Sequence, residues 1–248
     1  MKMKVSIITV SYNSAKTIEE TIHSVLNQDY KNIEYIVIDG ASSDNTVEII
    51  NRYKADIAHV VSEPDKGIYD AMNKGIKIAT GNLIGILNSD DVYENSSVIS
   101  NIISALEGND AVYADLVYVQ QNNLNRIKRV WKSGKYKVNS FLYGWMPPHP
   151  TFFVKKECYT KYGLYNTNLN SAADYELMLR FIHKNKITVG YYENVIVKMR
   201  LGGVSNATIK NRFKANREDK LAWKINNLKP KSFTFLLKPL RKLKQIRI

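Results

Sequence analysis

A pair of adjacent carboxylates directly follows a short apolar segment near the middle of the chain. The segment Asn82–Leu87 is largely aliphatic and comes after Gly81, a pattern that predicts a buried parallel strand, and positions 88–91 then read Asn-Ser-Asp-Asp. Ligands of open α/β sheets bind just beyond the carboxyl ends of such strands. Carboxylate oxygens suit hard cations such as Mg²⁺ or Mn²⁺, which bridge to the phosphates of a nucleotide. A turn that caps the next helix uses the same residue types, so these four residues alone leave both interpretations open.

Four predicted strands in the first ninety residues would position such a site. Short apolar segments alternate with segments whose apolar residues recur at helical spacing. The strands are predicted over Val5–Val10, Tyr35–Ile38, His59–Val61 and Asn82–Leu87, and the helices over about 17–28, over about 46–53 and through Ala71, Met72 and Ile76. Alternating strands and helices predict an α/β fold built on a right-handed, doubly wound parallel sheet.

Beyond Asp91 the pattern is less regular. Further strands are predicted at Ala111–Ala114, Thr151–Val154, Thr188–Tyr191 and Val195–Val197, with a helix over about 173–183 and a long aromatic loop over 136–150. Loops of that length are often functional. We expect one compact domain over residues 1–205, followed by a basic helical tail over 206–248.

Composition favours a globular chain in a reducing compartment. Of 248 residues, 44% are hydrophobic and 24% are charged, which is ordinary for such a protein. The single cysteine, Cys158, excludes an internal disulfide, and we expect it to be a buried filler. We expect no secretory leader, and no apolar run approaches the roughly 18 residues that a membrane-spanning helix requires.

Positive charge is concentrated in the tail. Residues 210–248 hold nine Lys and four Arg against two acids, which leaves only +2 of the net charge of +13 for the rest of the chain. Apolar residues recur there at helical spacing: Phe233, Leu236, Leu237, Leu240, Leu243 and Ile246. This profile is typical of a helix that lies on anionic lipid, although a helix packed on the body would share it. No nucleic-acid recognition motif accompanies the charge, so we expect no nucleic-acid partner.

Six segments of the chain resemble, in order, the inverting glycosyltransferases of the large bacterial family 2, which have the GT-A fold. The segments are VSIITVSYN (5–13), DGASSDNT (39–46), DKGIYDAMNKG (65–75), NSDD (88–91), SAADYEL (171–177) and GGVS (202–205). The resemblance implies a Rossmann-like, mostly parallel nucleotide-binding half, a smaller mixed sheet on the acceptor side and a C-terminal helical tail. It also implies transfer of a sugar, with inversion, from a nucleotide-diphospho-sugar donor, a UDP-sugar being favoured.

The resemblance implies roles for residues at the strand ends. Val10, Ser11 and Tyr12 match the nucleotide-base pocket, where a phenol ring would stack on the base. Asp39 matches the acid that hydrogen-bonds uracil or ribose, and a carboxylate at the end of a second strand suits sugar hydroxyls. Lys66 lies where the family places cationic contacts to the nucleotide, although a solvated surface lysine is the equal alternative.

The family's metal motif is usually Asp-x-Asp, and this chain departs from it with Asn88 at the first position. We expect Asn88 to hydrogen-bond ribose or to coordinate weakly through its amide oxygen. The divalent cation, Mg²⁺ or Mn²⁺, is then assigned to Asp90, with Asp91 second. It would neutralise charge on the departing nucleoside diphosphate. The departure keeps open an alternative, a nucleotide-sugar-binding subunit without turnover.

The resemblance implies that Asp174 is the general base. Inversion requires a base that takes the proton of the acceptor hydroxyl, and a carboxylate does this for water in inverting glycosidases. A charge that favours a helix N-terminus is the alternative for Asp174, and Glu176 is the second candidate for the base. His149 would contact metal or phosphate or have no chemistry, and we include it among the donor-binding candidates. By family analogy the acceptor is a saccharide or lipid-linked, the pathway builds a surface polysaccharide, and the protein is cytoplasmic on the inner face of the membrane.

Overall fold

The computed structural model describes residues 2–202 and 209–243, and the side chains at all of these positions except 209–215 and 242–243. Three features of the sequence lie outside the described residues. They are positions 203–205 of the last family segment, the predicted domain boundary at 205/206, and the end of the tail with Ile246.

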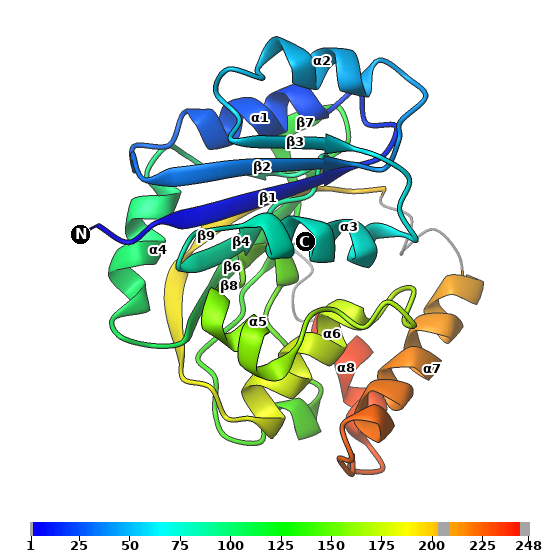
Figure 1. Ribbon diagram of the computed structural model, residues 1–248. Helices are drawn as coiled ribbons and strands as arrows, with labels where there is room; N and C mark the ends of the chain where they lie inside the picture. The colour runs from blue at the N-terminus through cyan, green and yellow to red at the C-terminus, as the bar shows by residue number, and fades with distance from the viewer. Residues whose placement is uncertain (1, 203–208, 244–248) are drawn as a thin grey trace.

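The first half of the chain confirms the predicted doubly wound sheet (Figure 1). Its parallel strands are β1 (Val5–Ser11), β2 (Ile33–Asp39), β3 (His59–Ser62) and β4 (Leu83–Ile86), in the spatial order β3-β2-β1-β4. The helices between them are α1 (Ile18–Leu26), α2 (Thr46–Arg52) and α3 (Ile68–Ile78). Successive residues of β1 point to opposite faces, so that Ile8 packs in the same cluster as α3 and Ile7 in the same cluster as α1 and α2.

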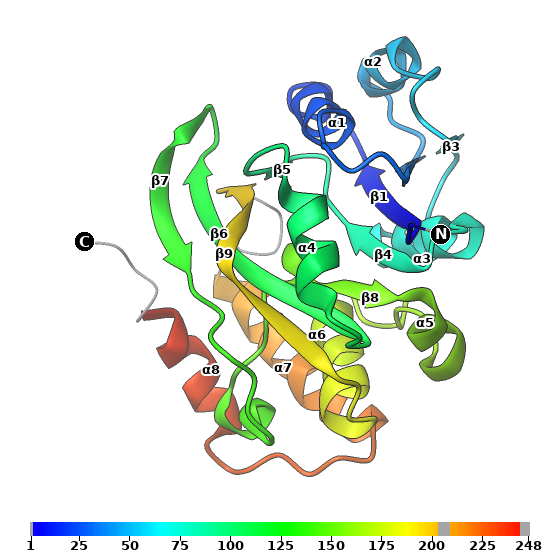
Figure 2. The ribbon, with the colours of Figure 1, turned by 90° about the vertical axis from the view of Figure 1, so that its left-hand side faces the viewer.

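The second half is a mixed sheet that continues from β4 (Figure 2). Its strands are β5 (Val92–Tyr93), β6 (Ala111–Gln120), β7 (Asn123–Trp131), β8 (Phe153–Lys155) and β9 (Val189–Arg200). β8 runs antiparallel to both β4 and β6, whereas β9 runs parallel to β6. The two strands predicted at 188–191 and 195–197 are one strand, β9, because irregularities in its pairing with β6 absorb the polar residues between them.

Several elements differ from the sequence-based expectation. α4 (Val98–Leu106), α5 (Lys156–Tyr162) and β7 were not predicted. β7 alternates cations with apolar residues and has an exposed outer face, so it lacks the apolar run that identifies a strand. The helix expected over 173–183 is α6 (Ala173–Met178), which continues as the π-helical turn η3 (Leu179–Lys184). The long aromatic loop contains two short 3₁₀ turns, η1 (Ser140–Tyr143) and η2 (His149–Thr151).

The described part of the tail forms two helices, α7 (Ile209–Ile225) and α8 (Thr234–Leu243), which lie beside α6 and η1 (Figures 1 and 2). Trp223 of α7 is buried, and Thr234 Oγ1 donates to the carbonyl of Leu142 at 2.7 Å. Leu236 and Leu240 of α8 are 68% and 53% exposed. The tail therefore packs part of its apolar surface on the body and leaves another part in contact with solvent.

Two expectations about composition can be compared with the structure. Cys158 is buried, and burial raises the pKa of its thiol to about 11, as expected of a filler residue. Over residues 2–202 and 209–243, no helix combines the length and the apolar character needed to cross a bilayer.

Candidate functional site

The ends of β1 and β2 meet around the buried carboxylate of Asp39. Ser11 Oγ donates to it at 3.0 Å, and Ser62 Oγ donates at 2.8 Å. Ser42 donates both its backbone amide, at 2.9 Å, and its hydroxyl, at 2.5 Å. These four donors match the roughly four lone-pair sites of a carboxylate. Asp39 therefore fixes three segments at the sheet edge, and direct contact with a nucleotide would displace one of these donors.

Tyr12 has the exposure that base stacking requires. Its side chain is 67% exposed, while Val10 is buried in the core. The Tyr12 ring lies beside Gly40, where an added Cβ would come within 3.4 Å of Tyr12 Cδ2 and 2.5 Å of Asp65 Oδ2. A side chain at position 40 would thus displace the Asp65 carboxylate and pack against the Tyr12 ring.

Two acidic side chains, Asp65 and Asp70, fix the backbone of the loop that carries Lys66. Asp70 Oδ2 accepts the backbone amide of Lys66 at 3.0 Å, and Asp65 Oδ1 accepts that of Gly67 at 2.7 Å. Gly67 adopts a φ of 107°, a conformation that glycine takes without strain. The Lys66 side chain is exposed beyond this fixed backbone.

Asn88, Asp90 and Asp91 lie together after β4. Asn88 Nδ2 donates to Asp91 Oδ2 at 3.2 Å, and Asn88 Oδ1 and Asp91 Oδ1 are buried without a hydrogen-bond partner among the described residues. Burial raises the pKa of Asp90. Burial and the neighbouring charge of Asp90 raise the pKa of Asp91 well above its usual value. The site thus has buried oxygens without donors and two adjacent carboxyl groups that are costly to ionise at the same time. A bound cation would stabilise both the oxygens and the two negative charges.

The residues fit a divalent cation that takes part of its coordination from outside the protein. Within the described parts of the chain, no group of three or more His, Cys, Asp or Glu side chains is placed to hold a metal. One or two carboxylates together with substrate phosphates and water is the usual coordination of protein-bound Mg²⁺. Asp90 and Asp91 supply that number of carboxylates.

Arg200 fixes the backbone of the acid pair. Its buried guanidinium donates from Nη1 to the carbonyl of Asp90 at 2.6 Å and pairs through Nη2 with Glu20 of α1. The arginine thereby ties the end of β9 to the turn that carries the two carboxylates. Sequence reasoning missed this role because Glu20 and Arg200 are 180 residues apart.

Asp174 lies in the first turn of α6, where its Oδ1 accepts the hydroxyl of Tyr69 at 3.3 Å. The same oxygen accepts the backbone amide of Tyr175 at 2.8 Å. Tyr69 of α3 and the first turn of α6 therefore orient the carboxylate of the predicted base.

His149 belongs to a cluster of aromatic side chains next to Asp174. Its Nε2 and the hydroxyl of Tyr165 are 2.7 Å apart, and the Tyr165 ring stacks on Tyr69 at a centroid distance of 5.7 Å. Burial lowers the pKa of His149, and the charge of Asp174 acts in the opposite direction. The imidazole is therefore neutral at pH 7 and forms a hydrogen bond with Tyr165. Contact of His149 with metal or phosphate stays a prediction.

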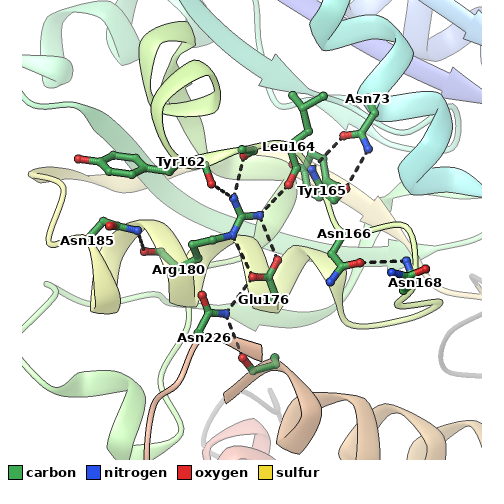
Figure 3. Close-up of polar contacts among 12 residues, drawn as sticks. Asn73, Tyr162, Leu164, Tyr165, Asn166, Asn168, Glu176, Arg180, Asn185 and Asn226 are labelled. Carbon is green, nitrogen blue, oxygen red and sulfur yellow. Dashed lines mark hydrogen bonds and ion pairs between the residues drawn. The ribbon is translucent and has the colours of Figure 1, made fainter. Parts of the chain in front are cut away.

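Tyr165 itself is anchored to α3 by Asn73 (Figure 3). The amide of Asn73 donates from Nδ2 to the carbonyl of Tyr165 and accepts the Tyr165 backbone amide at Oδ1, both at 2.9 Å. The family segment 65–75 therefore supports the Asp174 side of the site as well as the loop near Lys66.

Glu176 is held in a buried ion pair (Figure 3). Arg180 donates to both of its oxygens, from Nε at 2.9 Å and from Nη2 at 3.0 Å. The same guanidinium donates to the backbone carbonyls of Tyr162, Gly163 and Leu164. A carboxylate that is 1% exposed and paired in this way is not free to accept a proton from substrate, so Asp174 remains as the candidate base.

Comparison with known proteins decides the family. The sequence profile described as Glycosyl transferase family 2 matches residues 6–166, which is more than half of the chain. The chain belongs to glycosyl transferase family 2. An uncharacterised glycosyltransferase of Mycobacterium tuberculosis is 36% identical to it over 178 residues, which cover 71% of this chain and 68% of the relative. A PGL/p-HBAD biosynthesis glycosyltransferase of Mycobacterium bovis is 26% identical, with 84% and 81% covered.

Solved structures share the fold of this family 2 transferase. Residues 1–349 of TarS from S. aureus, in complex with UDP-GlcNAc, superpose with a TM-score of 0.72 at 17% identity and cover 98% of this chain and 73% of TarS. The mannosyltransferase PcManGT from Pyrobaculum calidifontis, in complex with GDP-Man and Mn²⁺, gives a TM-score of 0.68 at 20% identity, with 98% and 70% covered. The predicted GT-A fold is confirmed.

Proposed function

We propose that this family 2 transferase moves a hexosyl group from a nucleotide-diphospho-sugar, a UDP-sugar in the first instance, to an acceptor hydroxyl with inversion. The observation that carries the proposal is the pair Asp90–Asp91 after β4, where buried oxygens of Asn88 and Asp91 have no hydrogen-bond donor among the described residues. A base on one side of the reacting carbon and a site for the leaving group on the other is what a single displacement requires.

The donor would bind at the edge formed by the ends of β1, β2 and β4. The exposed Tyr12 ring is available to stack on the base, and Ser11 and Asp39 organise the backbone below it. Lys66, exposed on a fixed loop, would be available to the negative charge of a nucleotide. TarS was solved with UDP-GlcNAc and PcManGT with GDP-Man, which supports a nucleotide-sugar as the donor of this chain.

A divalent cation, Mg²⁺ or Mn²⁺, would be held by Asp90 and Asp91. The buried oxygens of Asn88 and Asp91 that lack donors, together with the Mn²⁺ in the PcManGT complex, support this assignment. When bound, the cation would neutralise charge on the nucleoside diphosphate. Arg200 would keep the Asp90 backbone in place during turnover.

Asp174 would accept the proton of the acceptor hydroxyl as that oxygen attacks the anomeric carbon. The Tyr69 hydroxyl orients the carboxylate, and the buried pairing of Glu176 removes the competing candidate. A carboxylate half-buried at the edge of an aromatic cluster is shielded from bulk water on one side and open to substrate on the other.

The acceptor would be a saccharide or a lipid-linked glycan, met by a cytoplasmic protein at the inner face of the membrane. On α8, Leu236 and Leu240 are exposed one helical turn apart, and the exposed rings of Phe233 and Tyr143 lie 5.8 Å apart beside them. Lys231 lies over both rings. Exposed aliphatic and aromatic groups with adjacent cations form a surface that fits anionic lipid. The PGL/p-HBAD relative supports a role in building a surface glycan.

The second candidate function is a nucleotide-sugar-binding subunit without turnover. Asn88 favours it, because an amide at this position removes one negative charge from the usual metal motif. Such a protein would bind donor but would not break its glycosidic bond.

Slow hydrolysis of the donor distinguishes the two candidates without knowledge of the acceptor. The protein is incubated with an α-linked UDP-sugar, and the anomer released first is identified by NMR spectroscopy. We expect the β-anomer, and we expect Asp174→Asn to lower the rate of release by about 10²-fold or more at unchanged donor affinity. Donor that is bound but never cleaved would establish the non-catalytic subunit instead, and release of the α-anomer would contradict inversion.

A further inference from the structure

Helix α7 contacts the residues on both sides of Asp174. At the start of the segment, Glu218 Oε2 accepts the backbone amide of Ser171 at 2.8 Å and its hydroxyl at 2.9 Å. Glu218 is buried, although it lies in the most basic part of the sequence. The N-cap of α6 is Ala172, which has no side chain able to cap the helix, and Glu218 instead fixes Ser171 directly before it.

The next contact is immediately after Asp174. Trp223 Nε1 donates to the hydroxyl of Tyr175 at 2.8 Å, and both side chains are almost completely buried. Lys238 of α8 places its ammonium 3.7 Å from the centroid of the Tyr175 ring and pairs with Asp219 of α7 at 2.7 Å. Tyr175 is thus held by both tail helices.

A third contact involves Glu176. Asn226, just beyond α7, donates from Nδ2 to Glu176 Oε1 at 2.9 Å, on the same carboxylate that Arg180 binds (Figure 3). Arg180 also donates to the carbonyl of Gly163, directly after α5, so Glu176 and Arg180 connect Asn226 to that turn. Positions 171, 175 and 176 are therefore each fixed by α7 or the residue directly after it.

α6 needs such support because it is short. It has six residues before the chain changes to a π-helical turn, and a helix of that length is not stable by itself. The backbone of Asp174 is consequently set by what α6 packs against. We propose that Glu218 and Trp223 are positioning residues, which hold α6 so that the Asp174 carboxylate meets the acceptor hydroxyl. The proposal rests on the role of Asp174 proposed above.

The consequence is that two buried residues of the basic tail, Glu218 and Trp223, position the catalytic carboxylate. A displacement of about 1 Å at a catalytic group costs about 10²-fold in rate. Glu218 contacts Ser171 just before α6 and Trp223 contacts Tyr175 within it, whereas the donor edge is formed by the ends of β1, β2 and β4. Loss of an α7 contact should therefore lower kcat and leave donor binding intact.

The experiment compares variants of the full chain. Glu218→Ala removes the acceptor for Ser171, and Glu218→Gln retains an acceptor oxygen at the same position. Trp223→Phe retains the buried ring and removes the donor to Tyr175. Leu221→Ala and Lys224→Ala, at exposed positions of the same helix, are the matched controls. Donor hydrolysis gives kcat and KM, calorimetry with UDP-sugar gives the donor Kd, and thermal unfolding verifies that each variant is folded.

We expect kcat to fall about 10- to 100-fold in Glu218→Ala and Trp223→Phe at unchanged donor Kd, with most of the activity restored in Glu218→Gln and full activity in both controls. Wild-type kcat in folded Glu218→Ala and Trp223→Phe would overturn the proposal, and so would equal losses in kcat and donor affinity. Asp174→Asn is run in parallel. Full activity in Asp174→Asn would refute the proposed base, whereas its inactivity beside fully active α7 variants would refute only the positioning role.

Discussion

Replacement of Arg180 by methionine should destabilise the protein far more than loss of an ordinary ion pair. The partner, Glu176, is 1% exposed, and Arg180→Met would leave it as a buried carboxylate with Asn226 as its remaining donor. Removal of one member of a buried pair costs about 3–5 kcal/mol. The three carbonyls that Arg180 binds also lose a donor, which places the expected loss in the upper part of this range.

The chain offers a matched control in Arg52→Met. Arg52 pairs with Glu19 at 3.4 Å, and the two side chains are 55% and 42% exposed. A pair of this kind contributes about 0–1 kcal/mol. Urea unfolding followed by tryptophan fluorescence measures the free energy of unfolding of both variants.

The pH dependence of the stability loss in Arg180→Met, and the added substitution Glu176→Gln, both test whether the unpaired charge of Glu176 causes that loss. Burial penalises the charged form of an acid, so the cost of an unpaired buried carboxylate disappears once that carboxylate is protonated at low pH. We therefore expect the deficit of Arg180→Met to shrink as the pH falls from 7 toward 4.5. Adding Glu176→Gln should recover more than about 1 kcal/mol at pH 7. A loss below about 1 kcal/mol, equal to that of Arg52→Met, would refute the reasoning.

Three further predictions follow from other contacts. Glu34 accepts hydrogen bonds from Lys4, Ser6 and Thr80, which hold its pKa at about 2 in spite of burial. The pKa of a glutamate in the unfolded chain is about 4.3. The contribution of Glu34 to stability is therefore present above about pH 4.3 and is lost as the pH falls toward 2. Glu34→Gln should flatten the acid limb of a stability–pH profile between pH 4.5 and 2, and an unchanged limb would contradict this. Asn73→Ala leaves the backbone amide and carbonyl of Tyr165 without partners, so urea unfolding should show a loss of about 1–3 kcal/mol per unsatisfied group, and no loss would exclude the anchoring role. The double variant Leu236→Ser/Leu240→Ser should sediment less with phosphatidylglycerol vesicles than the wild type. The control is Leu221→Ser/Ile225→Ser, at apolar positions of α7 that are 42% and 41% exposed, and it should sediment like the wild type. Equal sedimentation of both double variants would count against the lipid surface.

The parallel half of the fold could be predicted because its signals are local. β1, β2 and β4 are short aliphatic runs that end in polar residues, and the residues that close them became the edge of the candidate site. β6 was predicted only to Ala114, because Asp115 interrupts the apolar pattern. In the structure Asp115 accepts the backbone amide of Ser133 and the hydroxyl of Tyr191, which allows the strand to continue to Gln120.

The parts of the site that could not be predicted depend on contacts between distant residues. Asn73 and Tyr165 are 92 positions apart, and Ser171 and Glu218 are 47 apart. No local pattern pairs them, although Asn73 lies in a segment that the family resemblance identified. Within the long aromatic loop, Trp145 packs on the body, because its Nε1 donates to the carbonyl of Ser133 at 2.8 Å and its ring is buried in the core. The tail packs on the body through Trp223 and leaves Leu236 exposed, and its contact with anionic lipid stays a prediction.

Donor binding tests the central claim most directly. The purified protein is titrated by calorimetry with UDP-, GDP-, dTDP- and CMP-sugars, with and without Mn²⁺, beside the variants Asp90→Ala and Asp174→Asn. We expect one nucleotide sugar to bind in a Mn²⁺-dependent manner, with binding lost in Asp90→Ala and retained in Asp174→Asn. Absence of binding by every donor, or binding that is indifferent to both Mn²⁺ and Asp90, would contradict the assignment of the acid pair as the site of the leaving group.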